Sequence, residues 1–199
     1  MSIPYPDKRV MRTKEKFSEV LLELMEEKSL DEITITEIVK RADFNRGTFY
    51  AHYRKKEDLL EENVEEMFKK LADAVRKPYA DLSIVDFDKL PSSSIILFDH
   101  FLENKRFYKL MLKPSYTYNF HAKMRERLDQ LFREEFEFQV DETASNIDTQ
   151  LFMTYRVHGI IGMIQEWIES DFRKPSSYMS EQLIHILKFY TPTITIKEK

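Results

Sequence analysis

Five hydrogen-bonding side chains lie close together in one short stretch of the chain: Asn45, Arg46, Thr48, Tyr50 and His52. Each of them can donate a hydrogen bond to a phosphate oxygen or to the edge of a base. Gly47 lies among them in the first turn of a predicted helix, where glycine costs about 1 kcal/mol relative to alanine. A close approach of the backbone to DNA would explain that glycine. The stretch is therefore a candidate surface for contact with nucleic acid.

The charge of this region differs from that of the rest of the chain. The net charge of the 199 residues is −4. Residues 40–56 hold six lysines and arginines against Asp43 alone, a local charge of +5 that leaves −9 for the remainder. A basic patch on an acidic body is expected of a protein that docks one face on phosphates. A solvated surface patch would explain the charge equally well.

Helical periodicity predicts the elements that would position these side chains. The first helix covers about 12–28, and its buried stripe consists of Phe17, Val20, Leu21, Leu24 and Met25. Thr34 and Glu37 form a capping box at the start of a second helix. A third helix extends from about Asn45 to His52 after a short break at Asp43 and Phe44. Two short helices joined in this way predict a helix-turn-helix unit.

The remainder of the chain is also predicted to be helical. A fourth helix begins at Lys55 or Lys56 and is stopped by Pro78. After a polar connector at 79–91, helical spacing resumes over 92–103, 104–112, 117–139, 147–170 and 176–190. The only alternating pattern is the tail Thr193–Ile196, which we interpret as a loose end. The expected fold is all-α with about nine helices.

The stretch ITITEIVKRADFNRGTFYAHYRKKEDLL, residues 33–60, resembles the N-terminal signature of the tetracycline-repressor (TetR) family. The resemblance covers about residues 10–60, and the turn, the Gly-Thr-Phe-Tyr sequence and the Lys-Glu-Asp-Leu sequence all match in order. Two positions depart from it. Asp43 occupies a turn position that is often glycine, and Lys28-Ser29 replaces a glycine after the first helix. Aspartate tolerates the left-handed conformation better than most residues do.

The resemblance implies roles for individual residues. It implies that Thr34, Lys56, Thr48 and Tyr50 contact phosphates, and that Thr36, Asn45, Arg46 and His52 lie where the family reads or approaches base edges. With Gly47, these residues form the predicted DNA-binding set. Tyr53 matches an aromatic core position, and Phe49 is expected to be buried as well. The expected organisation is a DNA-binding domain at 1–56, a connecting helix at 57–78, and a helical regulatory and dimerisation domain at 79–199.

Two glycines support an interface in the C-terminal part. Gly159 and Gly162 interrupt the strongly apolar helix predicted at 147–170, at a cost of roughly 2 kcal/mol. Close approach of another helix would compensate for them. The resemblance implies a homodimer joined by the last two helices, here 147–170 and 176–190. Close packing inside the monomer is the alternative.

Aromatic and methionine side chains crowd the same part of the chain. They predict a pocket for an apolar or aromatic small molecule. The candidate lining residues are Phe98, Phe101, Met111, Tyr118, Met124, Phe152, Tyr155 and Trp167. An ordinary aromatic core would give the same composition.

Several other functions are not supported by the sequence. There are no cysteines, and the histidines lack metal-ligand spacing, so neither a metal nor a cofactor is expected. The sequence contains no nucleophile motif and no phosphate loop, so an enzyme is not expected. The absence of a long apolar run argues against a membrane span, and the N-terminus does not resemble a signal peptide. A cytoplasmic location is the default expectation.

The leading hypothesis is a homodimeric transcriptional repressor that binds a palindromic DNA operator and is released by a small-molecule inducer. The fourth helix is expected to be the only long element linking the DNA-binding unit to the body. The alternative is a DNA-bound scaffold or co-activator whose body binds a protein. An apolar cavity within 92–170 would favour the first hypothesis, and a fully packed interior would favour the second.

Overall fold

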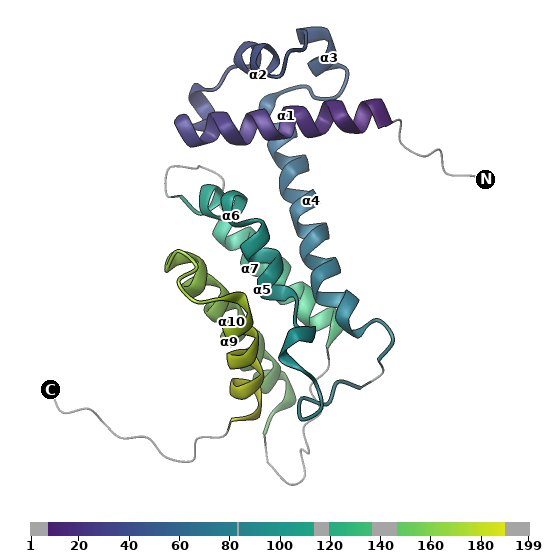
Figure 1. Ribbon diagram of the computed structural model, residues 1–199, viewed down its shortest axis with the longest axis vertical. Coiled ribbons are helices and arrows are strands. Elements are labelled where there is room, and N and C mark those ends of the chain that lie inside the picture. Colours follow the sequence, from purple (N-terminus) through teal and green to yellow (C-terminus); the bar gives the residue numbers. More distant parts are fainter. Residues whose placement is uncertain (1–7, 83, 114–119, 137–146, 190–199) are drawn as a thin grey trace, which may run out of the picture. The chain divides into compact units, whose positions relative to one another are not determined.

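A computed structural model describes residues 8–82, 84–113, 120–136 and 147–189. Every regular element in these ranges is a helix (Figure 1), which confirms the all-α class. The tail at Thr193–Ile196 lies outside the described residues. No helix in the described ranges is long and apolar enough to cross a membrane. The chain divides into two compact units: residues 1–70 with 106–121 form unit 1, and residues 71–105 with 122–199 form unit 2.

Unit 1 contains the N-terminal helices. These are α1 (Lys8–Glu27), the 3-10 turn η1 (Leu30–Glu32), α2 (Ile35–Arg41), α3 (Arg46–Tyr50) and the first part of α4 (Lys56–Arg76). The predicted stripe of α1 is buried as expected, with Phe17 fully enclosed. The ring of Phe17 lies 5.2 Å from Phe44 and 5.4 Å from Phe49, so one residue of α1 supports the turn and α3 together.

Helix α6 (Lys105–Met111) packs with the N-terminal helices, which the sequence did not indicate. Arg106 donates to both carboxylate oxygens of Glu26, at 2.6 and 3.1 Å. The Phe120 ring stacks on Phe68 at 5.7 Å and meets Phe107 edge-on at 5.8 Å. These contacts place residues 106–121 in unit 1.

The chain consequently passes between the two units three times. It crosses inside α4 after Lys70, and inside α7 (Phe120–Glu135) after His121. Between them it crosses after Lys105, the first residue of α6, which follows α5 (Leu97–Glu103). Helix α4 is therefore not the only long element linking the units, because α7 also belongs to both. The periodicity of each helix was readable from the sequence, but its partners depended on long-range packing.

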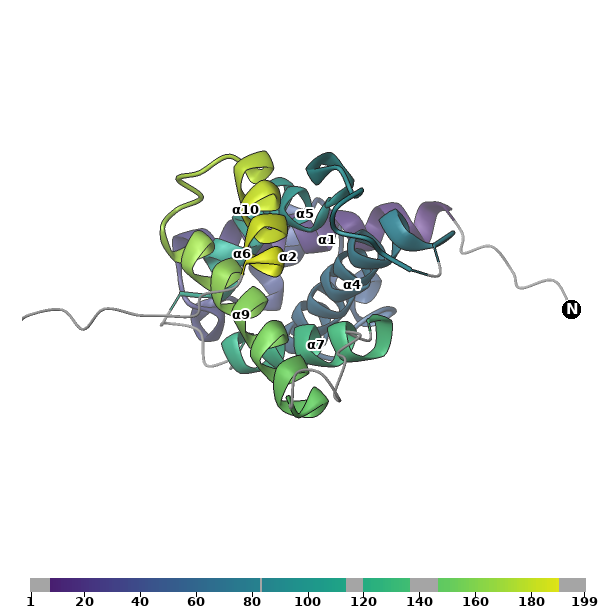
Figure 2. The same cartoon turned by 90° about the horizontal axis from the view of Figure 1, so that it is seen from below.

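Unit 2 consists of the end of α4, α5, most of α7, α9 (Thr149–Glu169) and α10 (Ser176–Lys188), with short turns η2 (Lys77–Tyr79) and η3 (Ser92–Ser94). Helix α10 lies beside α5 (Figure 2). The buried Ser180 hydroxyl donates to the carbonyl oxygen of Ile95 at 3.0 Å. At the turn before α10, the Trp167 indole N–H donates to the carbonyl oxygen of Lys174 at 2.9 Å, which fixes the path from α9 to α10.

Candidate nucleic-acid interface and ligand cavity

The start of α2 is fixed by its own sequence. Thr34 caps the helix by accepting a hydrogen bond from the Glu37 amide at 3.2 Å, and the Glu37 carboxylate accepts from the Thr34 amide at 2.9 Å. This is the predicted capping box. The hydrogen bond from Lys28 and those from Thr34 lower the pKa of Glu37 to about 2. Thr34 and Thr36 are both exposed and can reach an outside ligand.

The turn between α2 and α3 depends on Asp43. Its φ of 58° is in the left-handed region, which aspartate tolerates and most other residues avoid. The Phe44 amide then donates back to the carbonyl oxygen of Val39 at 2.9 Å and closes the end of α2. Asp43 therefore fulfils the geometric role of the glycine that is often found at this position.

Helix α3 presents the predicted polar side chains on one short turn. The Asn45 side-chain oxygen caps α3 by accepting from the Thr48 amide at 2.8 Å and from the Thr48 hydroxyl at 3.2 Å. Arg46 donates to the Tyr50 hydroxyl at 3.2 Å, and both side chains are exposed. Phe49, on the opposite side of the helix, is fully buried. The helix ends at Tyr50, so His52 lies just beyond it and is half-buried.

The structure gives a reason for glycine at position 47 that the sequence did not indicate. A Cβ atom built on Gly47 would lie 3.1 Å from the Asn45 side-chain oxygen that caps the helix. An alanine would press on the cap, because that distance is shorter than ordinary van der Waals contact. Close approach to DNA, the use inferred from the sequence, remains a prediction for the same glycine.

Lys56 is engaged within the protein. Its ammonium group donates to the carbonyl oxygen of Ile33 at 2.7 Å and to that of Asp31 at 3.0 Å. These bonds join the first residue of α4 to the segment that leads into α2. An ammonium has three donors, so a third remains for a phosphate. Lys56 thus has a positioning role that the sequence did not indicate, in addition to its predicted contact.

The basic patch is smaller than the sequence suggested. Arg41 forms a bidentate pair with Glu27 at 2.6 and 3.1 Å, so its charge is neutralised by a residue outside the patch. Four exposed cations form no ion pair with any described residue: Lys40, Arg46, Arg54 and Lys55. The sequence indicated Lys40, Arg54 and Lys55 as part of a DNA-contacting surface only through the summed charge of residues 40–56. The same charge count could have marked each of these three residues as a candidate phosphate contact.

A partly buried network fixes the segment after α3. Tyr53 is 5% exposed, and its hydroxyl donates to Glu62 of α4. Lys14 of α1 pairs with the same carboxylate at 2.6 Å. Burial and the bond to Glu62 raise the pKa of Tyr53 well above its usual range. Tyr53 therefore has the structural role that was expected for it.

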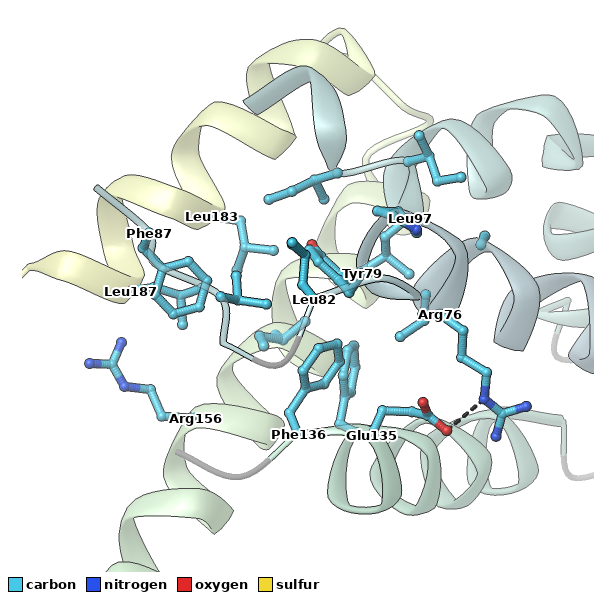
Figure 3. Close-up of a pocket in the computed structure, with 18 of the residues that line it drawn as sticks. Arg76, Tyr79, Leu82, Phe87, Leu97, Glu135, Phe136, Arg156, Leu183 and Leu187 are labelled. Atoms are coloured by element: carbon cyan, nitrogen blue, oxygen red, sulfur yellow. Dashed lines mark hydrogen bonds and ion pairs between the residues drawn. The ribbon is translucent and has the colours of Figure 1, made fainter. Parts of the chain in front are cut away.

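Unit 2 contains a cavity of about 810 Å³ (Figure 3). Its walls come from the end of α4, the segment 78–87, the start of α5, and helices α7, α9 and α10. The lining is largely apolar and includes Val75, Tyr79, Leu82, Ile84, Phe87, Leu97, Phe136, Phe152, Val157 and Leu183. Its charged residues are Arg76, Glu135 and Arg156. The segment read from sequence as a polar connector thus supplies one apolar wall.

Most of the residues predicted to contact a ligand lie elsewhere. Phe152 lines the cavity. Phe98, Phe101, Met124 and Trp167 are buried in the core of unit 2, where the Phe98 and Trp167 rings pack edge to face at 5.5 Å, and Met111 is buried in unit 1. Tyr155 is 75% exposed, and Tyr118 lies outside the described residues. Helical spacing identified burial but did not separate packed rings from a cavity lining. The described residues contain no cluster of three or more metal-binding side chains.

Two family models match the chain. One, described as bacterial regulatory proteins of the tetR family, covers residues 19–62. The other, described as a transcriptional regulator C-terminal region of the TetR class, covers residues 88–189, just over half of the chain.

Individual relatives agree with this result. The chain is 20% identical over 175 residues to the HTH-type transcriptional regulator YxbF of Bacillus subtilis (strain 168), covering 86% of this chain but only 44% of that protein. Two solved structures, each 17% identical, share its fold over 89% of this chain and 94% of theirs. They are a TetR-family regulator from Syntrophomonas wolfei str. Goettingen, with a TM-score of 0.65, and the dihydroxyacetone kinase operon activator DhaS, with a TM-score of 0.62.

Proposed function

Because the chain belongs to the TetR family of transcriptional regulators, we propose that it is a homodimeric repressor released from a palindromic operator by a small-molecule inducer. The observation that carries the DNA-binding part is the surface of α3. Its exposed donors are fixed by the Asn45 cap, and unpaired cations such as Arg46 and Lys55 lie on and beside it. Donors on a recognition helix read base edges, while neighbouring cations bind phosphates. We retain the cytoplasm as the proposed location.

The dimer is proposed to form through α9 and α10. A Cβ atom on Gly159 or on Gly162 would meet no atom within 4 Å in the monomer. Among the described residues, no side chain or backbone of the same monomer packs closely enough on these positions to require glycine. Leu151 and Tyr155, on the same side of α9, are 70% and 75% exposed. A second copy of α9 would cover this surface and would use the close approach that glycine permits.

The cavity supports regulation by a small molecule. Its volume lies within the roughly 300–1,000 Å³ typical of ligand sites. Ala74, Val75 and Arg76 of α4 line it, and α4 begins at Lys56, which is bonded to the segment preceding α2. A ligand that displaces the end of α4 would move this helix and thereby change the spacing of the two recognition helices in the dimer. Operator binding requires a spacing of roughly 34–36 Å.

Selection of bound DNA from a random pool would test the proposal. We expect two inverted half-sites whose centres lie about one helical turn apart. Single, unpaired sites would contradict the dimeric arrangement. A reporter gene placed behind the selected sequence would then separate repression from activation.

The alternative of a DNA-bound scaffold predicts a packed interior in the regulatory domain. The cavity favours the inducer hypothesis, although its walls extend beyond the predicted region 92–170 to residues 74–87 and 183–187. A screen in which ligands bind without changing operator affinity would favour the scaffold.

A further inference from the structure

We propose that the cavity of unit 2 binds a carboxylate with an apolar body, whose acid group pairs with Arg156. This inference rests on the proposed regulatory function and specifies the class of its ligand. It is carried by the difference between the two arginines at the cavity and by the exposed apolar side chains of its wall.

The two arginines differ in how their charge is compensated. Arg76 donates to the Glu135 carboxylate at 2.5 Å, so that end of the cavity is neutral. Among the described residues, Arg156 pairs with no carboxylate. Its Nη1 donates to the carbonyl oxygen of Ile186 at 3.3 Å, and its guanidinium lies 4.9 Å from the Phe152 ring centroid. Figure 3 shows Arg156 at the end near Phe87 and Leu187, and the Arg76–Glu135 pair at the other end.

The guanidinium of Arg156 is also incompletely hydrogen-bonded. Its Nε is buried and has no hydrogen-bond partner. A buried donor without an acceptor is costly, and a carboxylate that approaches the edge of a guanidinium accepts two parallel hydrogen bonds. An acid group at this end of the cavity would accept from the Nη groups, and a small rotation of the side chain would bring the buried Nε into the same bidentate contact.

Charge complementarity favours a single negative charge. The charged lining residues are Arg76, Glu135 and Arg156, a net charge of +1. A carboxylate neutralises that charge, whereas a phosphate monoester would bring about −1.5 to −2 at neutral pH. A neutral or cationic ligand would leave the Arg156 charge in an apolar site without a partner, which is unfavourable.

The wall formed by residues 78–87 indicates an apolar body. Leu82 and Ile84 line the cavity although they are 52% and 73% exposed. Figure 3 shows Leu82 with Tyr79 and Phe136 between the two charged ends. A hydrocarbon chain that starts at Arg156 and extends toward Arg76 would cover these side chains and remove their apolar surface from water.

Dodecanoate and dodecan-1-ol form a matched pair of probes that differ in the acid group. Calorimetric titration of the full chain is done below the micelle concentration of dodecanoate and below the solubility limit of dodecan-1-ol. It should show dodecanoate binding roughly 10- to 100-fold more tightly than the alcohol. Arg156→Met should abolish this preference, because it weakens the binding of dodecanoate and removes the unpaired charge that disfavours the alcohol. Arg156→Lys should retain part of it. The exposed Arg173 provides the control, because Arg173→Met removes a positive charge outside the cavity.

A second variant tests the apolar wall without disturbing the core. Ile84→Asp replaces an exposed side chain and should weaken binding of both probes. The proposal is overturned if neither probe binds, if the alcohol binds as tightly as the acid, or if Arg156→Met leaves their affinity ratio intact.

Operator release is measured separately by mobility shift. Preferential binding of the acid without release would retain the site and refute the inducer role.

Discussion

The proposed recognition surface of unit 1, formed by α3 and the start of α2, and the cavity of unit 2 are built in different ways. The polar groups of the recognition surface are positioned by neighbours in sequence: Asn45 caps the helix that carries Arg46, and Thr34 caps α2 three residues before Glu37. The cavity is formed by segments that are far apart in the chain, from Ala74 of α4 to Leu187 of α10. Local chemistry fixes the first surface, whereas only long-range packing can create the second. The following predictions test this difference, beginning with the largest effect.

Phe17→Ala should give the largest difference in stability between the two units. Phe17 is 0% exposed and supports both Phe44 and Phe49, so its loss should destabilise unit 1 by about 3–5 kcal/mol. Thermal unfolding should show an early transition for unit 1, and operator binding should be lost. Phe189→Ala, at a 72% exposed position, should change stability by less than about 0.5 kcal/mol. A single transition lowered for the whole chain would mean that the units are not independent.

Gly159→Leu should weaken the dimer and leave the monomer folded. Open space surrounds this position in the monomer, whereas overpacking an interface typically costs about 1–3 kcal/mol. Sedimentation should show the dimer dissociating at concentrations roughly tenfold higher or more. Gln130→Leu, on the exposed side of α7, is the control. An unchanged dimer would place the interface elsewhere.

Arg46→Ala should relax base specificity. Arg46 is exposed at the start of α3, and a bidentate contact of arginine with guanine contributes about 1–3 kcal/mol of discrimination. Competition binding with operator variants measures this loss. Arg54→Ala, which removes an exposed cation beyond α3, should weaken binding to all sequences alike. Equal effects of both substitutions on specificity would contradict the assigned roles.

Lys56→Ala should affect both DNA affinity and folding. Loss of one phosphate contact should lower the salt slope of binding by about one for all sequences. Loss of the hydrogen bonds to Ile33 and Asp31 should also destabilise unit 1 by about 1 kcal/mol. Salt titrations and urea unfolding measure the two effects separately. A change in the preferred DNA sequence would show that Lys56 reads bases.

The smallest predicted effect is the acid sensitivity of the α2 cap. The folded-state pKa of Glu37 is about 2, below its usual value of 4.5. Its stabilising contribution should therefore be complete above pH 4.5 and should be lost as the pH falls from there toward 2. The urea midpoints of wild type and Glu37→Gln should converge over that range. Glu126→Gln, at an exposed position on α7, should show no such convergence.

The relation between sequence and structure differs between the two regions. The capping box at Thr34, the Asn45 cap and the left-handed turn at Asp43 all occur where the sequence predicted them. Each depends on groups only a few residues apart, so residue type and spacing suffice to predict it. The same reasoning missed the bonds of Lys56 to Ile33 and Asp31, because those residues lie 23 and 25 positions away.

The sequence by itself determined the helical class, the helix-turn-helix elements and the polar face of α3. Tertiary structure alone decided that α6 packs with the DNA-binding helices and that Trp167 packs in the core while Leu82 and Ile84 line a cavity. Helical periodicity reports only that a side chain faces inward. Whether it meets another side chain or an empty space depends on how distant helices pack, and that information is not carried by any short stretch of the chain.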